Sequence, residues 1–305
     1  MDGILIINKE KDYTSRDVVN IVSKELETKK VGHTGTLDPL ATGVLVLCIG
    51  EATKIAELLT ATYKEYIAEV VLGLNTDTLD ITGNILEEKQ VIISLDEIKK
   101  VLESITGKYM QEVPIYSAVK VNGKKLYEYA RNNIEVELPK KEVDIKNIEL
   151  LDYKIENNKT IFKIKCLVSK GTYIRSLIRD IAFKLNTIGT MKSLIRIKQG
   201  DFSIENCYSL EDIKNKNYKL IPIDKVLKNY ETIYVDEYIE KKIKNGALLE
   251  NRYTSDIVLF KNKNNILLAL YKIYDKDKNK VKPYKMFLKD KWKFVFSFFF
   301  YNIMI

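Results

Sequence analysis

Two kinds of hydrophobic pattern alternate along most of this chain. Short continuous apolar runs, such as Ile4–Ile7 and Val44–Ile49, are typical of buried strands. Apolar residues spaced three and four apart predict amphipathic helices. Two of these helices follow capping residues, Thr14 and Ser94, and a third covers Thr172–Leu185. Strands and helices are therefore interspersed along the chain.

Several predicted strands are neighbours in sequence. Val143–Ile155 and Thr160–Val168 are joined by two consecutive asparagines, a pattern that indicates a β-hairpin. Tyr66–Leu72 is a further apolar run, as is Leu194–Phe202, which a glycine interrupts. Adjacent strands interspersed with helices predict an α+β fold with a mixed, mostly antiparallel sheet and packed helices.

The pattern changes near residue 230. Beyond this point short apolar runs, Ile257–Phe260 and Ile266–Tyr271, alternate with turns rich in Lys, Asn and Asp. We therefore expect a larger domain, residues 1–230, and a small C-terminal β-rich domain, residues 231–305. The closing segment, Trp292–Ile305, is aromatic and apolar, and its apolar run, Phe294–Ile305, is shorter than the roughly 18 residues that span a bilayer.

Composition narrows the possible partners. Lys and Arg total 50 and Asp and Glu total 42, and the net charge of +8 favours a polyanionic partner. A lysine-rich solvated surface remains the alternative reading of this charge. The three cysteines lie far apart without metal-ligand spacing, and a single histidine excludes a histidine-based metal site. From the cysteines and the histidine we expect no metal. The N-terminus lacks the pattern of a signal peptide, so we expect a soluble, cytoplasmic protein.

The segment Gly32–Gly43, with sequence GHTGTLDPLATG, concentrates polar chemistry immediately before an apolar strand. Three glycines and a proline favour one defined loop conformation, which could hold Asp38 and His33 rigidly at a strand edge. Asp38 is either a catalytic carboxylate or the start of an Asp-Pro turn. His33 is either part of a site or a hydrogen-bonded loop histidine.

This loop resembles the catalytic loop of the TruB family of tRNA pseudouridine-55 synthases. The family's other motifs follow in the same order, at Lys64–Ala68, Leu72–Asp80, Pro114–Lys120, Ser169–Leu177 and Leu194–Arg196. The resemblance covers roughly residues 1 to 225. One departure occurs at Lys9–Ser15, where the family usually has Lys-Pro-x-Gly-x-Thr-Ser and this chain has neither the proline nor the glycine. The local turn and the role of Lys9 are therefore open.

The resemblance implies a pseudouridine synthase fold and a reaction at a flipped-out uridine that needs no cofactor. It implies that Asp38 is the catalytic carboxylate and that Arg175 is the cation paired with it. Tyr66 would lie against the flipped base and could help to remove the proton from C5.

The resemblance also implies a set of substrate-binding residues: His33, Lys9, Tyr173 and Leu194. Leu194 would close the apolar side of the pocket, and His33 would lie where the flipped nucleotides leave the RNA stack. Lys9, with the pairs Lys124–Lys125 and Lys140–Lys141, is a candidate for phosphate contacts. The expected partner is the T-stem–loop of tRNA, bound by a monomer without a protein partner.

Two other functions fit parts of the pattern. A non-catalytic module that binds or folds tRNA could keep the loop for recognition alone, in which case Asp38 would be dispensable. A glycoside hydrolase could also use Asp38, but such enzymes usually need a second carboxylate that faces the scissile bond, and the motifs contain no matched partner.

Overall fold

The computed structural model describes residues 1–287, which form two compact units. The larger unit comprises Leu5–Cys48 and Ala56–Tyr218. The smaller one comprises Met1–Ile4, Ile49–Ile55 and the described residues from Lys219 onward. The division therefore lies about ten residues before the boundary expected near residue 230. It does so because the chain after Tyr218 pairs with the N-terminus, where Ile4 and Ile221 exchange backbone hydrogen bonds.

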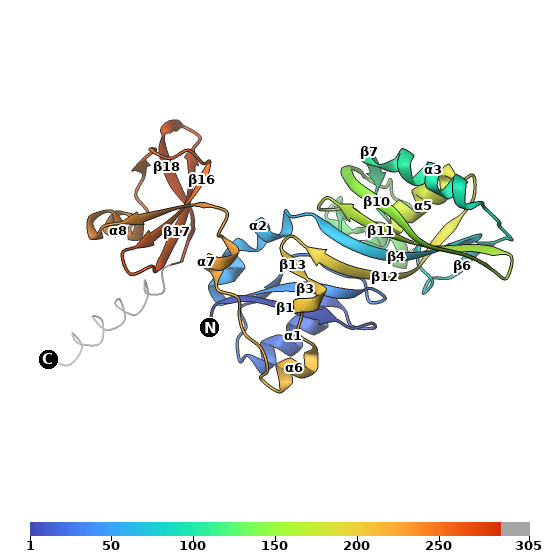
Figure 1. Ribbon diagram of the computed structural model, residues 1–305, viewed down its shortest axis with the longest axis horizontal. Coiled ribbons are helices and arrows are strands. Elements are labelled where there is room, and N and C mark those ends of the chain that lie inside the picture. Colours follow the sequence, from blue (N-terminus) through green and yellow to red (C-terminus); the bar gives the residue numbers. More distant parts are fainter. Residues whose placement is uncertain (288–305) are drawn as a thin grey trace. The chain divides into compact units, whose positions relative to one another are not determined.

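A nine-stranded sheet forms the framework of the larger unit (Figure 1). Its main path runs β1-β3-β12-β4-β11-β10-β7, with β2 beside β3 and β13 beside β12. Strand β12 is parallel to β3, whereas it pairs with β4 antiparallel, as β4 does with β11 and β11 with β10. The mixed, mostly antiparallel sheet is thus confirmed. The strands are β1 (Gly3–Lys9), β2 (Val31–His33), β3 (Thr42–Ile49), β4 (Lys64–Leu72), β7 (Gly107–Glu112), β10 (Lys140–Glu156), β11 (Lys159–Val168), β12 (Gly189–Gln199) and β13 (Phe202–Ser203).

Helices cover this sheet where the apolar spacing predicts them. The predicted capping boxes begin α1 and α3, with Thr14 and Ser94 as their N-caps. Helices α3 and α5 pack against each other over one face of the sheet, and α1 packs on β2 and α6 (Figure 1). The helices and 3-10 turns of this unit are α1 (Ser15–Glu25), α2 (Ala56–Thr60), α3 (Leu95–Ile105), α4 (Leu126–Arg131), α5 (Ile174–Lys184), η2 (Ile204–Asn206) and α6 (Leu210–Lys214).

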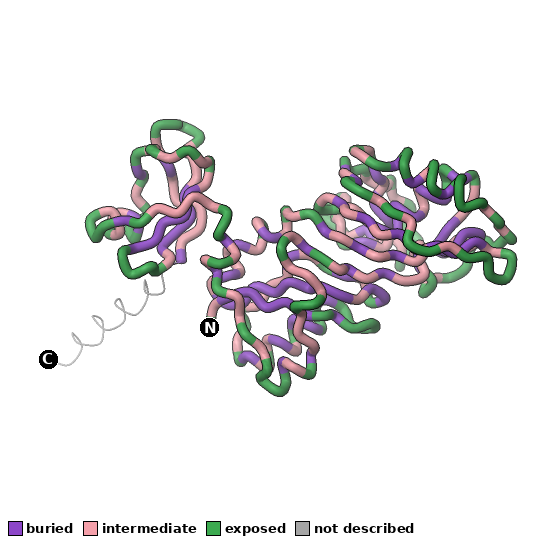
Figure 2. The backbone as a smooth tube through the Cα atoms, viewed as in Figure 1, coloured by how far each residue is buried: buried purple, intermediate pink, exposed green. Residues whose placement is uncertain are grey.

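The core lies between these helices and the central strands. Ile98 and Leu102 of α3 meet Leu177 and Ile181 of α5 in one buried cluster with the inward side chains of β4 and β11, among them Phe162. Figure 2 shows burial concentrated along the strands, with exposed positions at the turns between them. The long hairpin of β10 and β11 turns at the two asparagines as predicted, and both have positive φ, 52° and 57°.

Gly107 ends the helix as predicted: α3 stops at Ile105, Thr106 is its C-cap, and Gly107, with φ of +102°, turns the chain into β7. One strand boundary differs from the prediction. Strand β12 begins at Gly189, five residues before Leu194. Its first half contains Thr190, a buried polar residue whose hydroxyl donates to the Leu74 carbonyl, so the apolar pattern is broken there. Two short hairpins complete the larger unit: β5 (Leu74–Thr76) with β6 (Ile85–Glu88), and β8 (Lys120–Val121) with β9 (Lys124–Lys125).

The smaller unit contains the predicted C-terminal β-rich region. Its sheet has the order β14-β16-β17-β18-β15, and its core includes an edge-to-face pair, Phe260 and Tyr271, with ring centroids 5.1 Å apart. The aromatic segment Trp292–Ile305 lies outside the described residues. The elements are η1 (Gly50–Ile55), α7 (Ile223–Val226), β14 (Glu231–Val235), α8 (Glu237–Lys244), β15 (Leu249–Glu250), β16 (Ile257–Asn262), β17 (Leu267–Tyr274) and β18 (Asp277–Met286).

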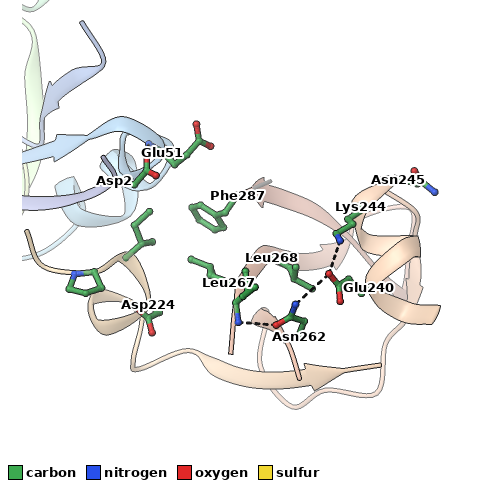
Figure 3. A pocket seen from close by; sticks show the side chains of 13 residues that line it. Asp2, Glu51, Asp224, Glu240, Lys244, Asn245, Asn262, Leu267, Leu268 and Phe287 are labelled. Carbon is green, nitrogen blue, oxygen red and sulfur yellow. Dashed lines mark hydrogen bonds and ion pairs between the residues drawn. The ribbon is translucent and has the colours of Figure 1, made fainter. Parts of the chain in front are cut away.

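A cavity of about 650 Å³ also lies within the smaller unit (Figure 3). On its wall, Glu240 of α8 accepts hydrogen bonds from Lys244 Nζ at 2.7 Å and from Asn262 Nδ2 at 3.5 Å. Leu268 and Phe287 contribute apolar lining.

Within residues 1–287, none of the helices is both long enough and apolar enough to cross a bilayer.

Candidate active site

The loop between β2 and β3 is held in one conformation by buried hydrogen bonds. The Ser15 hydroxyl, at the start of α1, accepts from the Leu37 amide at 2.8 Å, and the Thr34 amide donates to the Val46 carbonyl at 3.1 Å. The Ala41 amide closes a turn on the Asp38 carbonyl at 3.0 Å. The loop therefore presents Asp38 from a fixed backbone.

Arg196 of β12 supports the same loop from the sheet. Its guanidinium is buried and donates to the carbonyls of Val44 at 2.6 Å, Gly35 at 3.1 Å and Thr36 at 3.4 Å. Gly43 has φ of +100°, and a Cβ there would lie 2.3 Å from the Arg196 carbonyl oxygen. Only glycine permits this approach of loop and strand.

The centre of the site is a two-point ion pair. Arg175, in the first turn of α5, contacts Asp38 through Nε to Oδ2 at 2.9 Å and through Nη2 to Oδ1 at 3.1 Å. The same guanidinium donates to the carbonyls of Thr78 at 2.9 Å and Tyr116 at 3.1 Å. Both oxygens of the carboxylate are thus oriented, as is usual for a bidentate arginine–carboxylate pair.

A cavity of about 260 Å³ opens beside this pair. Five of the predicted site residues line it: Asp38, Tyr66, Tyr173, Arg175 and Leu194. Tyr66 is buried on β4, Leu194 is buried on β12, and Tyr173 precedes α5. Burial raises the pKa of the Tyr173 hydroxyl, and nearby Arg175 partly opposes this rise. Polar and apolar groups from four separate segments therefore converge on one concave space.

Lys9 does not lie among the residues that line the cavity, and its expected role in phosphate contact is wrong for this structure. Its side chain is 0% exposed, and its ammonium donates to the carbonyls of Tyr13 at 2.7 Å, Glu10 at 2.9 Å and Pro39 at 3.3 Å. A group enclosed in this way cannot meet a phosphate in solvent. Lys9 instead ties the chain before α1 to the residue that follows Asp38.

His33 also lies outside the set of cavity-lining residues. It ends β2 and is half-buried, and its Nδ1 is buried without a hydrogen-bond partner in the described part of the chain. Burial lowers the pKa of its imidazole, and the charges of Arg16 and Arg196 lower it further. The imidazole is therefore biased toward its neutral form.

Comparison with known proteins identifies the family to which this chain belongs. A family model described as TruB family pseudouridylate synthase, N-terminal domain, matches residues 23–174. A protein of Clostridium tetani named tRNA pseudouridine synthase B is 44% identical over 274 residues, which cover 89% of this chain and 92% of the relative. A Bacillus cereus protein of the same name is 40% identical over 302 residues, or 95% and 98% of the two chains. This chain belongs to the TruB family. It is accordingly a pseudouridine synthase, an isomerase.

Solved structures agree with this TruB assignment at the level of the fold. The chain is similar to a protein in an H/ACA ribonucleoprotein bound to a substrate RNA containing 2′-deoxyuridine, with a TM-score of 0.67, 23% identity, and coverage of 95% and 86%. A chain from a Cbf5-Nop10-Gar1 complex gives a TM-score of 0.66 at 24% identity, over 94% and 84% of the two chains. The pseudouridine synthase fold is therefore confirmed.

The departure from the TruB pattern near Lys9 leaves the turn intact. Asp12 stands where the family usually has glycine, and its φ is +70°. Aspartate is one of the few residues that adopts this left-handed conformation at modest cost. The Asp12 amide donates to the Pro39 carbonyl at 2.9 Å, so the turn still contacts the loop that carries Asp38.

Several groups around the site were not assigned roles from the sequence. The carbonyls of Thr78 and Tyr116 belong to recognisable TruB motifs, but every residue has a carbonyl, so their contact with Arg175 gives no sequence signal. Lys64 is buried at the cavity and donates to the carbonyls of Thr60 and Thr62. Burial lowers the pKa of Lys64 to about 8, and the positive charge of Arg196 also lowers it.

The lining of the cavity also bears on the alternatives. Among the described residues that line it, Asp38 is the one carboxylate. A glycoside hydrolase site with two opposed carboxylates does not match this lining. Within residues 1–287, groups of three or more His, Cys, Asp or Glu side chains suited to a metal ion are absent.

Proposed function

We propose that this enzyme converts the uridine at position 55, in the T-loop of tRNA, into pseudouridine, and that Asp38 is its catalytic carboxylate. The observation that carries the proposal is the two-point contact of Arg175 with Asp38 at the edge of a cavity that Tyr66 and Leu194 also line. The names of the relatives, tRNA pseudouridine synthase B, support tRNA as the substrate.

The reaction is an isomerisation whose atoms balance without a second substrate. The bond from ribose C1′ to uracil N1 breaks, the base turns, and a new bond joins C1′ to C5. The proton on C5 leaves, and N1 carries a proton in the product. Asp38 can attack the sugar, add to the base or remove a ribose proton, and each route uses a carboxylate oxygen held at a defined position.

The neighbouring side chains suit a flipped uracil. The ring of Tyr66 offers a face on which an unpaired base can stack, and its hydroxyl can accept the C5 proton. Leu194 covers the apolar side of the same space. A base outside the RNA stack costs a few kcal/mol, which such contacts offset.

The second candidate, a non-catalytic tRNA-binding module, is less well supported by this geometry. Recognition alone does not need a bidentate guanidinium on a partly exposed carboxylate inside a cavity.

We further propose that the enzyme acts in the cytoplasm, which agrees with its three free cysteines, two of them buried. It needs no partner protein for catalysis.

The test is incubation with an isolated T-stem–loop hairpin, followed by mapping of pseudouridine at single-nucleotide resolution. Conversion at the uridine that corresponds to position 55 is the expected result. Binding of the hairpin should weaken steeply with added salt, because each phosphate contact releases counterions. Conversion of a different RNA with no conversion of the hairpin would refute the substrate assignment.

A further inference from the structure

A buried glutamine outside the cavity holds the start of the helix that carries Arg175. Gln111 of β7 is 1% exposed and makes two hydrogen bonds with the backbone of Tyr173. The Tyr173 amide donates to Gln111 Oε1 at 2.8 Å, and Gln111 Nε2 donates to the Tyr173 carbonyl at 3.2 Å. Tyr173 is the N-cap of α5, and its own side chain does not cap the helix. The glutamine side chain therefore supplies a hydrogen-bond acceptor for the Tyr173 amide, whereas the Tyr173 carbonyl also accepts from the Leu177 amide within the helix.

Gln111 also makes a hydrogen bond on the side away from Tyr173. Its Nε2 also donates to the Tyr109 hydroxyl at 2.8 Å, and this hydroxyl donates to Asp180 Oδ2 at 3.1 Å, further along α5. The next residue of β7 adds a second tie to the helix, because Ser176 Oγ donates to the Glu112 carbonyl at 2.8 Å. An edge strand of the sheet thus fixes the first turn of α5 at two points.

We propose that Gln111 is a positioning residue for the isomerisation. The carboxamide of Gln111 fixes the backbone of Tyr173. It thereby determines the position of Arg175, two residues later, relative to Asp38. It also sets where the Tyr173 side chain lines the cavity. A misplacement of about 1 Å in such a site can cost 10²-fold in rate, so support of this kind affects turnover more than binding. The inference rests on the proposed roles of Asp38 and Arg175.

The test compares two variants that each lose buried hydrogen bonds of this network. Gln111→Met keeps the length of the side chain but removes both bonds to Tyr173. Tyr109→Phe removes the hydroxyl that contacts Gln111 and Asp180, and it leaves the bonds to Tyr173 in place. With the T-stem–loop hairpin, Gln111→Met should lower kcat about tenfold or more, with KM and the hairpin Kd within about threefold of wild type. Tyr109→Phe should lower Tm by about as much as Gln111→Met does. It should leave kcat within about twofold of wild type.

A third variant separates positioning from stability and remains informative if Gln111→Met does not fold. In Gln111→Glu, an ionised carboxylate can accept from the Tyr173 amide but cannot donate to its carbonyl, whereas a protonated carboxyl can do both. The ratio of its kcat to that of wild type should therefore rise as pH falls. A purely structural role predicts a constant ratio.

Wild type and Asp38→Asn are measured beside these variants. If wild type converts the hairpin and Asp38→Asn does not, a wild-type kcat in Gln111→Met overturns the inference alone. Equal losses of kcat in Gln111→Met and Tyr109→Phe, or a ratio for Gln111→Glu that does not change with pH, overturn it as well. If wild type is inactive on the hairpin or Asp38→Asn is active, the proposed function fails instead.

Discussion

Where Arg175 and Asp38 form their ion pair, the Arg175 side chain is buried and the Asp38 side chain is partly exposed. The Arg175 side chain is 6% exposed, whereas 39% of the Asp38 side chain remains accessible. The cation is thus enclosed by the protein, with the carbonyls of Thr78 and Tyr116 as additional acceptors, and the carboxylate it orients faces the cavity. This asymmetry suits a carboxylate that is proposed to act on a bound substrate, because one side is fixed by the protein and the other is open to the ligand.

Removal of the guanidinium should therefore slow the reaction strongly. Arg175→Met leaves Asp38 without its orienting partner, and we expect activity to fall about 10²-fold. Arg175→Lys keeps the charge but not the two-point geometry, so it should be intermediate. Arg179→Met is the matched control: Arg179 lies on the same helix and pairs with Glu112 and Asp180 outside the cavity. Steady-state rates that are equal in Arg175→Met and Arg179→Met would contradict this role.

Two variants of Tyr66 distinguish its proposed functions. Tyr66→Phe keeps the ring and removes the hydroxyl, whereas Tyr66→Leu removes both. Loss of a proton acceptor typically costs about 10²–10⁴-fold in rate, and stacking is worth about 1–3 kcal/mol per base. We expect both variants to be nearly inactive, with hairpin binding retained by Tyr66→Phe. Wild-type turnover in Tyr66→Phe would exclude the hydroxyl as acceptor. Tyr63→Phe, which alters a hydroxyl bonded to Asp144 rather than one in the cavity, provides the control.

The buried position of Lys9 predicts a pH-dependent contribution to stability. Burial lowers the pKa of Lys9 to about 8, against opposing attraction from Asp38 and Asp12, and the ordinary value is 10.5. Between these values the unfolded chain binds more protons at this site than the folded chain. The contribution of Lys9 to the free energy of unfolding therefore rises as pH increases through this window, and it is constant below it.

Urea denaturation at pH 7.5 and 9.5 tests this prediction. From the lower to the higher pH, wild type should gain about 1–2 kcal/mol of unfolding free energy relative to Lys9→Met, which lacks the titrating group. Lys64 titrates in the same direction but is common to both proteins. Lys11→Met, at an exposed position of the neighbouring turn, should keep the wild-type dependence. Parallel pH dependences of wild type and Lys9→Met would show that the ammonium of Lys9 titrates normally.

The sequence was most informative where local rules act. The capping boxes at Thr14 and Ser94 and the paired asparagines of the long hairpin depend on residues a few positions apart, and all three predictions are confirmed. The fold and family followed from motifs in the correct order. The start of β12 was missed because Thr190, a polar residue, is buried there through a bond to a distant carbonyl.

The supporting contacts of the site could not be predicted from the sequence. Arg175 and Arg196 bind backbone carbonyls, which do not differ between residue types. Lysine is a residue type that commonly binds phosphate, so the sequence alone suggests that role for Lys9. Only the three carbonyls around its ammonium show why it is enclosed. Gln111 and Tyr173 are 62 positions apart, so periodicity cannot relate them.

The central claim is that the Asp38 carboxylate performs the chemistry, and Asp38→Asn tests it most directly. The amide keeps the shape of the side chain and can still lie beside Arg175, but it cannot act as a carboxylate nucleophile or base. The measurement is pseudouridine formation in the T-stem–loop hairpin together with hairpin binding. The account predicts no detectable product, with binding retained within about tenfold, or roughly 1.4 kcal/mol. Product formation by Asp38→Asn at close to the wild-type rate would contradict it.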